Sequence, residues 1–195
     1  MHQPAWGVDY QLDSLQWASS LLKSNLSAAN AQNLPFAGNS FDCIFTHYFF
    51  LWAVSPIDAL LEIKRCLKPG GICLILGEPD YGGRIDFPLE LEFIKQLQLS
   101  ALKKLGADPC IGRKLKGILS TCGFRSIYGG ILGSEWQDRP DTDTLHTTDL
   151  HNILYDAALS GLGVDSRELI AIDQKARQEG SRIIFVPTFF FSALK

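Results

Sequence analysis

The sequence lacks the cysteine spacing that a metal site or a disulfide framework would need. The 195 residues contain five cysteines, and no two of them form a C-x-x-C pair: Cys43, Cys66, Cys73, Cys110 and Cys122. Metal sites and disulfide scaffolds rely on convergent cysteine spacing. We therefore expect buried free thiols and no metal site.

Long apolar runs and an excess of basic charge are also missing. No segment approaches the roughly 18 to 20 apolar residues of a membrane span, and the start MHQPAWGVDY lacks the basic and apolar regions of a signal peptide. The net charge of -3 argues against a dominant nucleic-acid surface, because such surfaces cluster Lys and Arg against phosphates. The sequence predicts a cytoplasmic protein with neither a membrane nor a nucleic-acid partner.

Two familiar catalytic patterns are absent as well. There is no G-x-x-x-x-G-K phosphate loop and no persuasive Ser/His/Asp order. Phosphotransferase and hydrolase chemistry are therefore disfavoured.

What the sequence does contain is an alternation of short β-rich runs with longer amphipathic segments. Such alternation is typical of an α/β sheet, and the length suits one hydrophobic core, so we expect a single domain over residues 1–195. The expected strands cover residues 5–8, 26–29, 41–50, 72–76, 124–132 and 182–191. The expected helices cover residues 12–23, 56–67, 89–105, 111–122, 149–160 and 166–178, with a charged turn-rich insert at 135–143.

Composition adds detail to three of these elements. The run 41–50 is aromatic and almost uncharged, as expected of a parallel strand covered on both faces. Pro56 suits the first turn of a helix, and Pro69, Gly70 and Gly71 are expected to end that helix. Pro187 favours an edge position or a bulge for the last strand, because proline cannot donate to a ladder.

Candidate site residues follow expected strands, because ligands of open parallel sheets bind beyond the carboxyl ends of the strands. Asp9 could accept the hydroxyl protons of a ribose while Tyr10 covers a purine; the alternative is that Asp9 caps the next helix. Asn30 and Ala31 could read an adenine edge with an amide side chain and a backbone donor. Their alternative is an ordinary polar turn.

Two further candidates follow the next strands. His47 could line a pocket or act as a base, although a histidine in an apolar run is often structural. The loop with Glu78, Asp80 and Tyr81 has a composition suited to substrate handling. A solvated loop would explain the same composition.

Four segments together resemble class I S-adenosylmethionine-dependent methyltransferases, particularly the small-molecule branch related to quinone-methylating enzymes. They are GVDY, NAQNLPFAGNSFDCIF, PIDALLEIKRCLKPGGICLILGEPD and RIIFVPTFFFSALK. The third, with its K-P-G-G turn, is the most specific. The resemblance implies a Rossmann-like, mostly parallel sheet with an antiparallel C-terminal strand, and methyl transfer from S-adenosylmethionine to a small-molecule acceptor.

The resemblance also implies roles for individual residues. Asp9 takes the place of the family's ribose-binding acid, with Tyr10 beside the adenine, and Ala31 supplies a backbone amide. Asn30 replaces the usual adenine-contacting aspartate, and its amide oxygen can still accept from the adenine amino group. His47 joins the cofactor and catalytic region, while Glu78, Asp80 and Tyr81 are expected to bind the acceptor.

One family feature has no counterpart in the sequence. The family's first strand and its G-x-G-x-G turn, where glycine permits close backbone approach to the cofactor, are not found. The sheet is therefore expected to lack its central strand, and cofactor binding to be weak or absent. A non-catalytic scaffold that forms a homodimer through the incomplete sheet is the alternative, and a nicotinamide-dependent dehydrogenase is a third interpretation.

Overall fold

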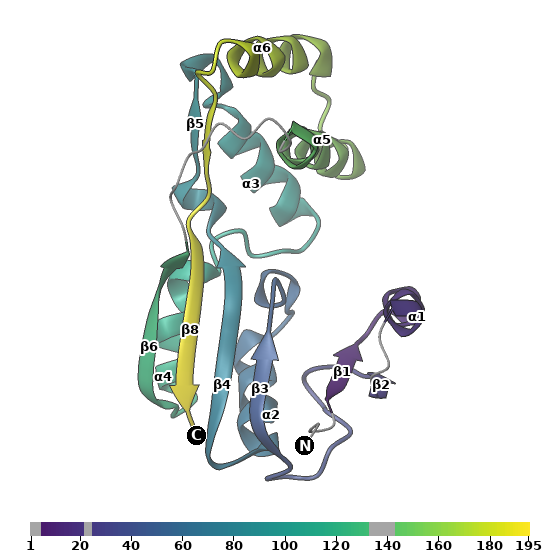
Figure 1. Ribbon diagram of the computed structural model, residues 1–195, viewed down its shortest axis with the longest axis vertical. Coiled ribbons are helices and arrows are strands. Elements are labelled where there is room, and N and C mark those ends of the chain that lie inside the picture. The colour runs from purple at the N-terminus through teal and green to yellow at the C-terminus, as the bar shows by residue number, and fades with distance from the viewer. Residues whose placement is uncertain (1–4, 22–24, 133–142) are drawn as a thin grey trace.

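The computed structural model describes residues 5–21, 25–132 and 143–195, with residues 143–148 described by their backbone only. Its strands form three hydrogen-bonded sheets in the order β1-β2, β3-β4-β8-β6 and β5-β7. Helices and strands alternate along the chain, which confirms the expected α/β class (Figure 1). The expected insert at 135–143 lies almost wholly outside the described residues.

The first unit is a parallel pair of strands joined by a helix. Strand β1 (Trp6–Asp9) pairs with β2 (Asn25–Ala28), and helix α1 (Leu12–Leu21) connects them. All three lie within about two residues of the ranges expected from the sequence. The pair is held beside the rest of the fold by Phe36, whose ring meets Trp6 at 5.6 Å and Phe41 at 4.9 Å.

The four-stranded sheet is mixed. Strand β3 (Phe41–Thr46) runs parallel to β4 (Leu67–Pro79), whereas β8 (Thr188–Leu194) is antiparallel to both β4 and β6 (Arg125–Leu132). The antiparallel terminal strand is as expected. The strand expected over 41–50 is shorter in the structure, because the chain turns at Tyr48, which has a positive φ of 50°.

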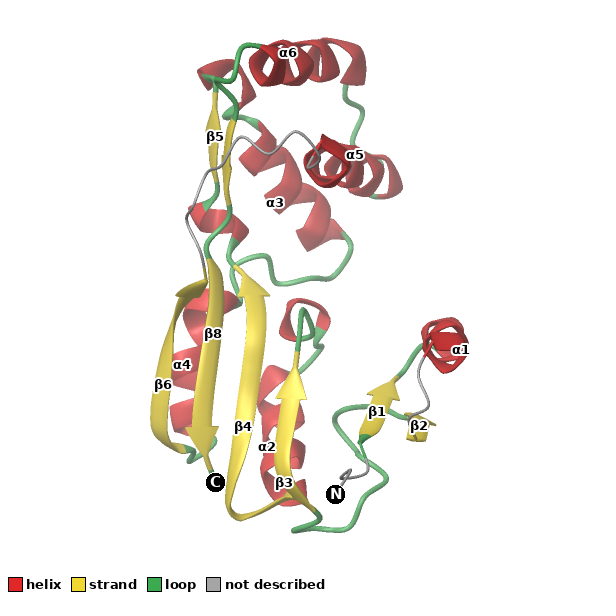
Figure 2. Ribbon diagram, viewed as in Figure 1, coloured by secondary structure: helices red, strands yellow, loops and turns green. Residues whose placement is uncertain are grey.

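One face of this sheet is covered and the other is open. Helices α2 (Pro56–Cys66) and α4 (Leu115–Thr121) pack behind it, and no described helix covers the front (Figure 2). The register places Phe45, Leu74, Ser192 and Tyr128 in one row across the front. Because Phe45 is 65% exposed and Tyr128 67% exposed, the expectation that β3 is covered on both faces is wrong.

Helix α2 begins and ends for the reasons read from the sequence. The Ser55 side chain accepts the Asp58 N–H as an N-cap, and Pro56 occupies the first turn. The K-P-G-G segment does end the helix, but it does so as the start of β4 and not as a turn before a short strand. The register between β3 and β4 shifts there, and Gly70 adopts a φ of 76°.

A second hydrophobic cluster lies beyond the carboxyl ends of β3 and β4. It is built from Leu91, Ile94, Leu150, Ile153 and Leu169. These residues belong to the short turn η3 (Leu89–Leu91), α3 (Ile94–Lys104), α5 (Asp143–Leu159) and α6 (Ser166–Gln178). Together with the antiparallel strands β5 (Ile85–Phe87) and β7 (Ile183–Phe185), these elements form a cap above the sheet (Figure 1).

Several helices and strands in and near the cap begin or end at residues other than those expected from the sequence. Helix α6 has the expected bounds, whereas α5 begins earlier and α3 later than expected, because residues 89–91 form a separate 3-10 turn. Residues 112–114 form another such turn before α4. The last strand is broken at Pro187 into β7 and β8, and β8 is an inner strand between β4 and β6, so the edge position is wrong and the strand is interrupted where an edge or a bulge was expected.

Candidate functional site

The candidate site lies at the carboxyl ends of β1, β2, β3 and β4. Strands β1 and β2 are parallel to each other, as are β3 and β4, so each pair brings the residues that follow its strands to one end. Helices α3 and α5 of the cap lie beyond the ends of β3 and β4 (Figure 1). All the sequence-predicted site residues fall in this region or at its margin.

Asp9 and Asn30 follow neighbouring parallel strands. Asp9 is paired with Ala28 at the end of β1, and the Ala29 N–H donates to the Asp9 carbonyl at 3.0 Å. The Asp9 carboxylate accepts the Gln11 N–H at 2.7 Å, and the Asn30 amide oxygen accepts the Gln32 N–H at 2.9 Å. Because Gln11 precedes helix α1, this bond closes a turn before the helix and does not cap it, and it uses only one carboxylate oxygen.

Two polar atoms here remain available to a ligand. Within the described part of the chain, Asp9 Oδ2 accepts no hydrogen bond and the Ala31 N–H donates none. Tyr10, beside Asp9, is 79% exposed, while Ala31 is partly buried against the main core. A carboxylate oxygen, a free amide and an exposed aromatic ring form a set that can contact ribose, adenine edge and adenine face.

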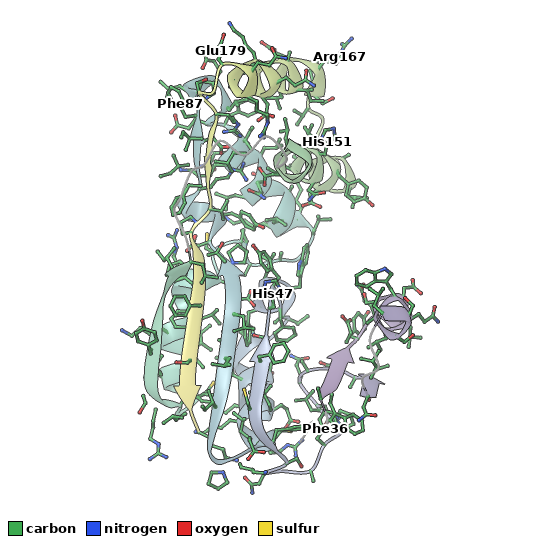
Figure 3. All side chains as sticks on the ribbon, viewed as in Figure 1. Phe36, His47, Phe87, His151, Arg167 and Glu179 are labelled. Atoms are coloured by element: carbon green, nitrogen blue, oxygen red, sulfur yellow. The ribbon has the colours of Figure 1, made fainter. Side chains whose placement is uncertain are left out.

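His47 lies directly after β3 (Figure 3). Its ring meets the Tyr48 ring at a centroid distance of 4.8 Å in an edge-on arrangement, and it packs over Gly77, where an added Cβ would lie 3.4 Å from its Cδ2. The side chain is exposed. His47 therefore lies at the carboxyl end of β3, with its ring against Gly77 and Tyr48.

Glu78 is placed differently from a substrate-binding acid. Its side chain is fully buried, and its carboxylate accepts three backbone N–H groups, from Phe49 at 2.8 Å, Phe50 at 3.0 Å and Leu51 at 3.2 Å. Burial raises the pKa of the Glu78 carboxyl, and the three amides oppose that rise. Both oxygens of Glu78 are thus engaged by the protein itself.

Both oxygens of the Asp80 carboxylate also bind a protein partner, whereas the Tyr81 hydroxyl does not. The buried Asp80 carboxylate receives both Nε and Nη2 of Arg113. The Tyr81 hydroxyl makes no hydrogen bond within the described residues, and burial raises its pKa, with Tyr48 and Asp149 adding to the rise. Of the three residues expected to bind an acceptor, Tyr81 is the one with a free polar atom.

Sequence reasoning missed a buried ionic network within the cap. Arg84 uses all its donors: Nε and Nη2 bind Asp86, Nη1 binds Gln98, and both terminal nitrogens bind Asp149. Burial disfavours its charge, but the two carboxylates raise the Arg84 pKa overall. Although Arg84 and Asp86 were visible in the loop composition, Asp149 lies 65 residues further along, and nothing local signals the pairing.

The network continues into α6. Arg182 donates to Asp86 at 2.8 Å and to Asp173 at 2.7 Å, and Arg177 also donates to Asp173. The positive and negative partners are thus matched, as buried charges require. This network ties β5, α5 and α6 together beside Tyr81.

Two searches of the described residues bear on other classes of function. No group of three or more His, Cys, Asp or Glu side chains there could hold a metal ion. None of the described helices is both long enough and apolar enough to cross a bilayer.

Comparison with known proteins points to one family. Residues 2–75 match the family model described as a methyltransferase domain. An uncharacterised methyltransferase of Schizosaccharomyces pombe is 40% identical over 86 residues, 43% of this chain and 30% of that protein. A ubiquinone/menaquinone biosynthesis C-methyltransferase of Haemophilus ducreyi is 42% identical over 52 residues, 27% of this chain and 20% of that protein.

The fold agrees with the sequence comparison. A crystal structure of a SAM-dependent methyltransferase of Thermotoga maritima superposes with a TM-score of 0.59 at 16% identity, covering 97% of this chain and 72% of that one. The chain spans about a third or less of the length of the two curated relatives named above. Residues 2–75 are thus similar to a methyltransferase domain, and the chain has the α/β fold of S-adenosylmethionine-dependent methyltransferases.

Proposed function

We propose that this chain takes part in methyl transfer from S-adenosylmethionine to a small-molecule acceptor. The observation that carries the proposal is the pair of unengaged atoms at neighbouring strand ends, Asp9 Oδ2 and the Ala31 N–H. They suit a ribose hydroxyl and an adenine ring nitrogen. Asn30 is proposed to accept from the adenine amino group, and Tyr10 to cover the ring.

The chemistry of such a site needs positioning more than proton transfer. When bound, the cofactor supplies an electrophilic methyl group on a sulfonium. The chain's own residues hold the two reactants in line, which can provide much of the acceleration. His47, placed after β3, is proposed as the base for an acceptor that keeps its proton, and the free Tyr81 hydroxyl as a polar contact to that acceptor.

We further propose that the sheet is incomplete between β1 and β3. These strands belong to different sheets and share no ladder, yet Phe36 packs against a residue of each. A strand inserted between them would give the family's order and complete the methionine side of the site. Without it, cofactor affinity of the isolated chain is expected to be weak.

Parallel titrations with S-adenosylmethionine and NAD test this proposal. We expect a thermal shift with S-adenosylmethionine and none with NAD, and a dissociation constant by calorimetry weaker than about 100 μM. The Asp9→Ala variant should lose the thermal shift, while Asp42→Ala, a matched change of an exposed aspartate paired with Lys68, should keep it. A larger shift with NAD would contradict the proposal, and low-micromolar binding would contradict the incomplete site.

The open front of the sheet favours a second candidate function, a scaffold that self-associates. Phe45 and Tyr128 lie in one cross-strand row and are both more than half exposed, and large exposed apolar surfaces mark interaction sites. Light scattering should then report a homodimer. The Phe45→Lys variant should be monomeric, and a wild-type monomer at high concentration would rule this function out.

A further inference from the structure

Four consecutive backbone N–H groups of the turn after β3 donate hydrogen bonds to the carboxyl end of β4. The Tyr48 N–H donates to the Gly77 carbonyl at 2.9 Å. The next three N–H groups, of Phe49, Phe50 and Leu51, donate to the Glu78 carboxylate. The four donors from one segment thus converge on two adjacent residues of another.

This arrangement replaces a local helix cap. The 3-10 turn η1 (Phe50–Trp52) has Phe49 at its N-cap position, and no side chain of its own segment caps it. The Glu78 carboxylate, 27 to 29 residues further along the chain, accepts its first amides instead. A carboxylate at the N-terminal end of such a turn satisfies otherwise unpaired donors and opposes their partial positive charge.

The anchored turn is the one that carries the site residues. Tyr48 holds a positive φ of 50°, a conformation that costs free energy for a bulky residue and persists only where the surroundings impose it. His47 precedes it and packs on Gly77. Glu78 thus holds the three residues that follow Tyr48, and His47 and Tyr48 lie between them and strand β3.

We infer that Glu78 is a positioning residue, which fixes the turn that holds His47 and Tyr48 and does not itself contact the acceptor. This inference rests on the proposed function for its catalytic meaning. It replaces the substrate-binding role that the sequence suggested for Glu78. A glutamine at this position would keep one acceptor oxygen for the N–H groups of Phe49 and Phe50 but would present its NH₂ group to the Leu51 N–H, so the clamp should weaken at Leu51.

Hydrogen exchange and histidine NMR test the clamp without any need for turnover. In Glu78→Gln, the Leu51 amide should exchange at least about tenfold faster, which corresponds to the loss of about one net hydrogen bond. The ring resonances of His47 should shift or broaden. The matched control is Glu62→Gln, which removes a carboxylate that also accepts a backbone N–H, from Leu34, far from this turn, and should leave His47 unchanged.

Methyl-transfer activity, measured with S-adenosylmethionine, then separates the inference about Glu78 from the proposed function. If transfer occurs, Glu78→Gln should lower kcat at least tenfold with a smaller change in KM, because the reacting groups are misplaced while the acceptor contact at Tyr81 remains. Unchanged exchange and an unchanged His47 signal in Glu78→Gln would overturn the inference and leave the proposed function standing. Altered signals in a protein that shows no S-adenosylmethionine binding would overturn the proposed function and retain the clamp.

Discussion

At the scale of single residues, the buried charged side chains bind other parts of the chain and stabilise the fold. Glu78, Asp80 and Arg84 all follow the core of β4, and each has a protein partner for its charged atoms. Their presence in one short segment resembled a substrate-binding loop when only the sequence was considered. The structure shows that burial of these groups is possible because partners arrive from η1, η4 and α5.

The Arg84 network gives a prediction about stability. Replacing Arg84 with Met should lower the free energy of unfolding by about 3–5 kcal/mol, because Asp149 would lose its arginine partner and the buried Asp86 would keep only Arg182. Urea denaturation measures this difference. Arg167→Met removes an exposed arginine and should change stability little; equal losses in the two variants would contradict the network's role.

Cys73 gives a prediction about pH. Burial raises the pKa of its thiol from 9.0 to about 12. The unfolded chain therefore ionises this thiol first, and the stabilising contribution of the neutral thiol, present below pH 9, is lost as pH rises toward 12. The free energy of unfolding should fall by up to about 1.4 kcal/mol per pH unit from this group.

The measurement is a set of chemical unfolding curves between those two pH values. The Cys73→Ala variant lacks the titrating group, so its stability should fall less steeply than that of the wild type. Parallel curves for the two proteins would show that Cys73 does not titrate differently in the folded state.

At the scale of elements, local patterns predicted the central αβ segment well. Ser55, Pro56 and the apolar spacing of Leu60 and Ile63 define α2, and the same residues cap it and face the core. The bounds of helix α6 were predicted equally well. Elements whose limits depend on distant partners were not. Strand β3 ends early because Gly77 and Glu78 hold the following amides, and β4 begins early because Leu67, before the K-P-G-G segment, already pairs with Phe41.

Two glycines of these elements should respond in opposite ways to alanine. At Gly71, a Cβ would lie 2.9 Å from the Lys68 carbonyl and 3.1 Å from that of Asp42, so Gly71→Ala should destabilise the fold by about 1–3 kcal/mol. At Gly117, in α4, a Cβ meets open space, so Gly117→Ala should stabilise by about 0.5–1 kcal/mol. Thermal denaturation of both variants tests the sign of each effect, and a stabilised Gly71→Ala protein would be inconsistent with the β4 register.

At the scale of the whole molecule, the sequence predicted the methyltransferase-like fold, its antiparallel terminal strand and the strand ends near Asp9 and Asn30. It did not predict that the sheet has one bare face, because the hydrophobic runs in β3 and β4 look the same whether one face or both are covered. It also did not predict the second hydrophobic cluster of the cap, which only long-range packing defines.

The bare face predicts the reactivity of the cysteines. Cys43 is exposed on the same side of β3 as Phe45, whereas Cys66, Cys73 and Cys122 are buried. A maleimide should label Cys43 in the folded protein and the three buried thiols only after unfolding. Mass spectrometry of labelled peptides identifies the site, with Cys43→Ser as the control; folded-state labelling of Cys73 as fast as that of Cys43 would contradict the covered and bare faces assigned here.

The most direct test of the cofactor site is an NMR titration of the folded chain with S-adenosylmethionine, which detects binding too weak for calorimetry. Saturable shifts should map to the amides of Tyr10 and Ala31 and to the side chain of Asn30, and should vanish in Asp9→Ala. Shifts confined to the cap or to the front of the sheet, or identical shifts in Asp9→Ala, would contradict the placement of a nucleoside at the ends of β1 and β2.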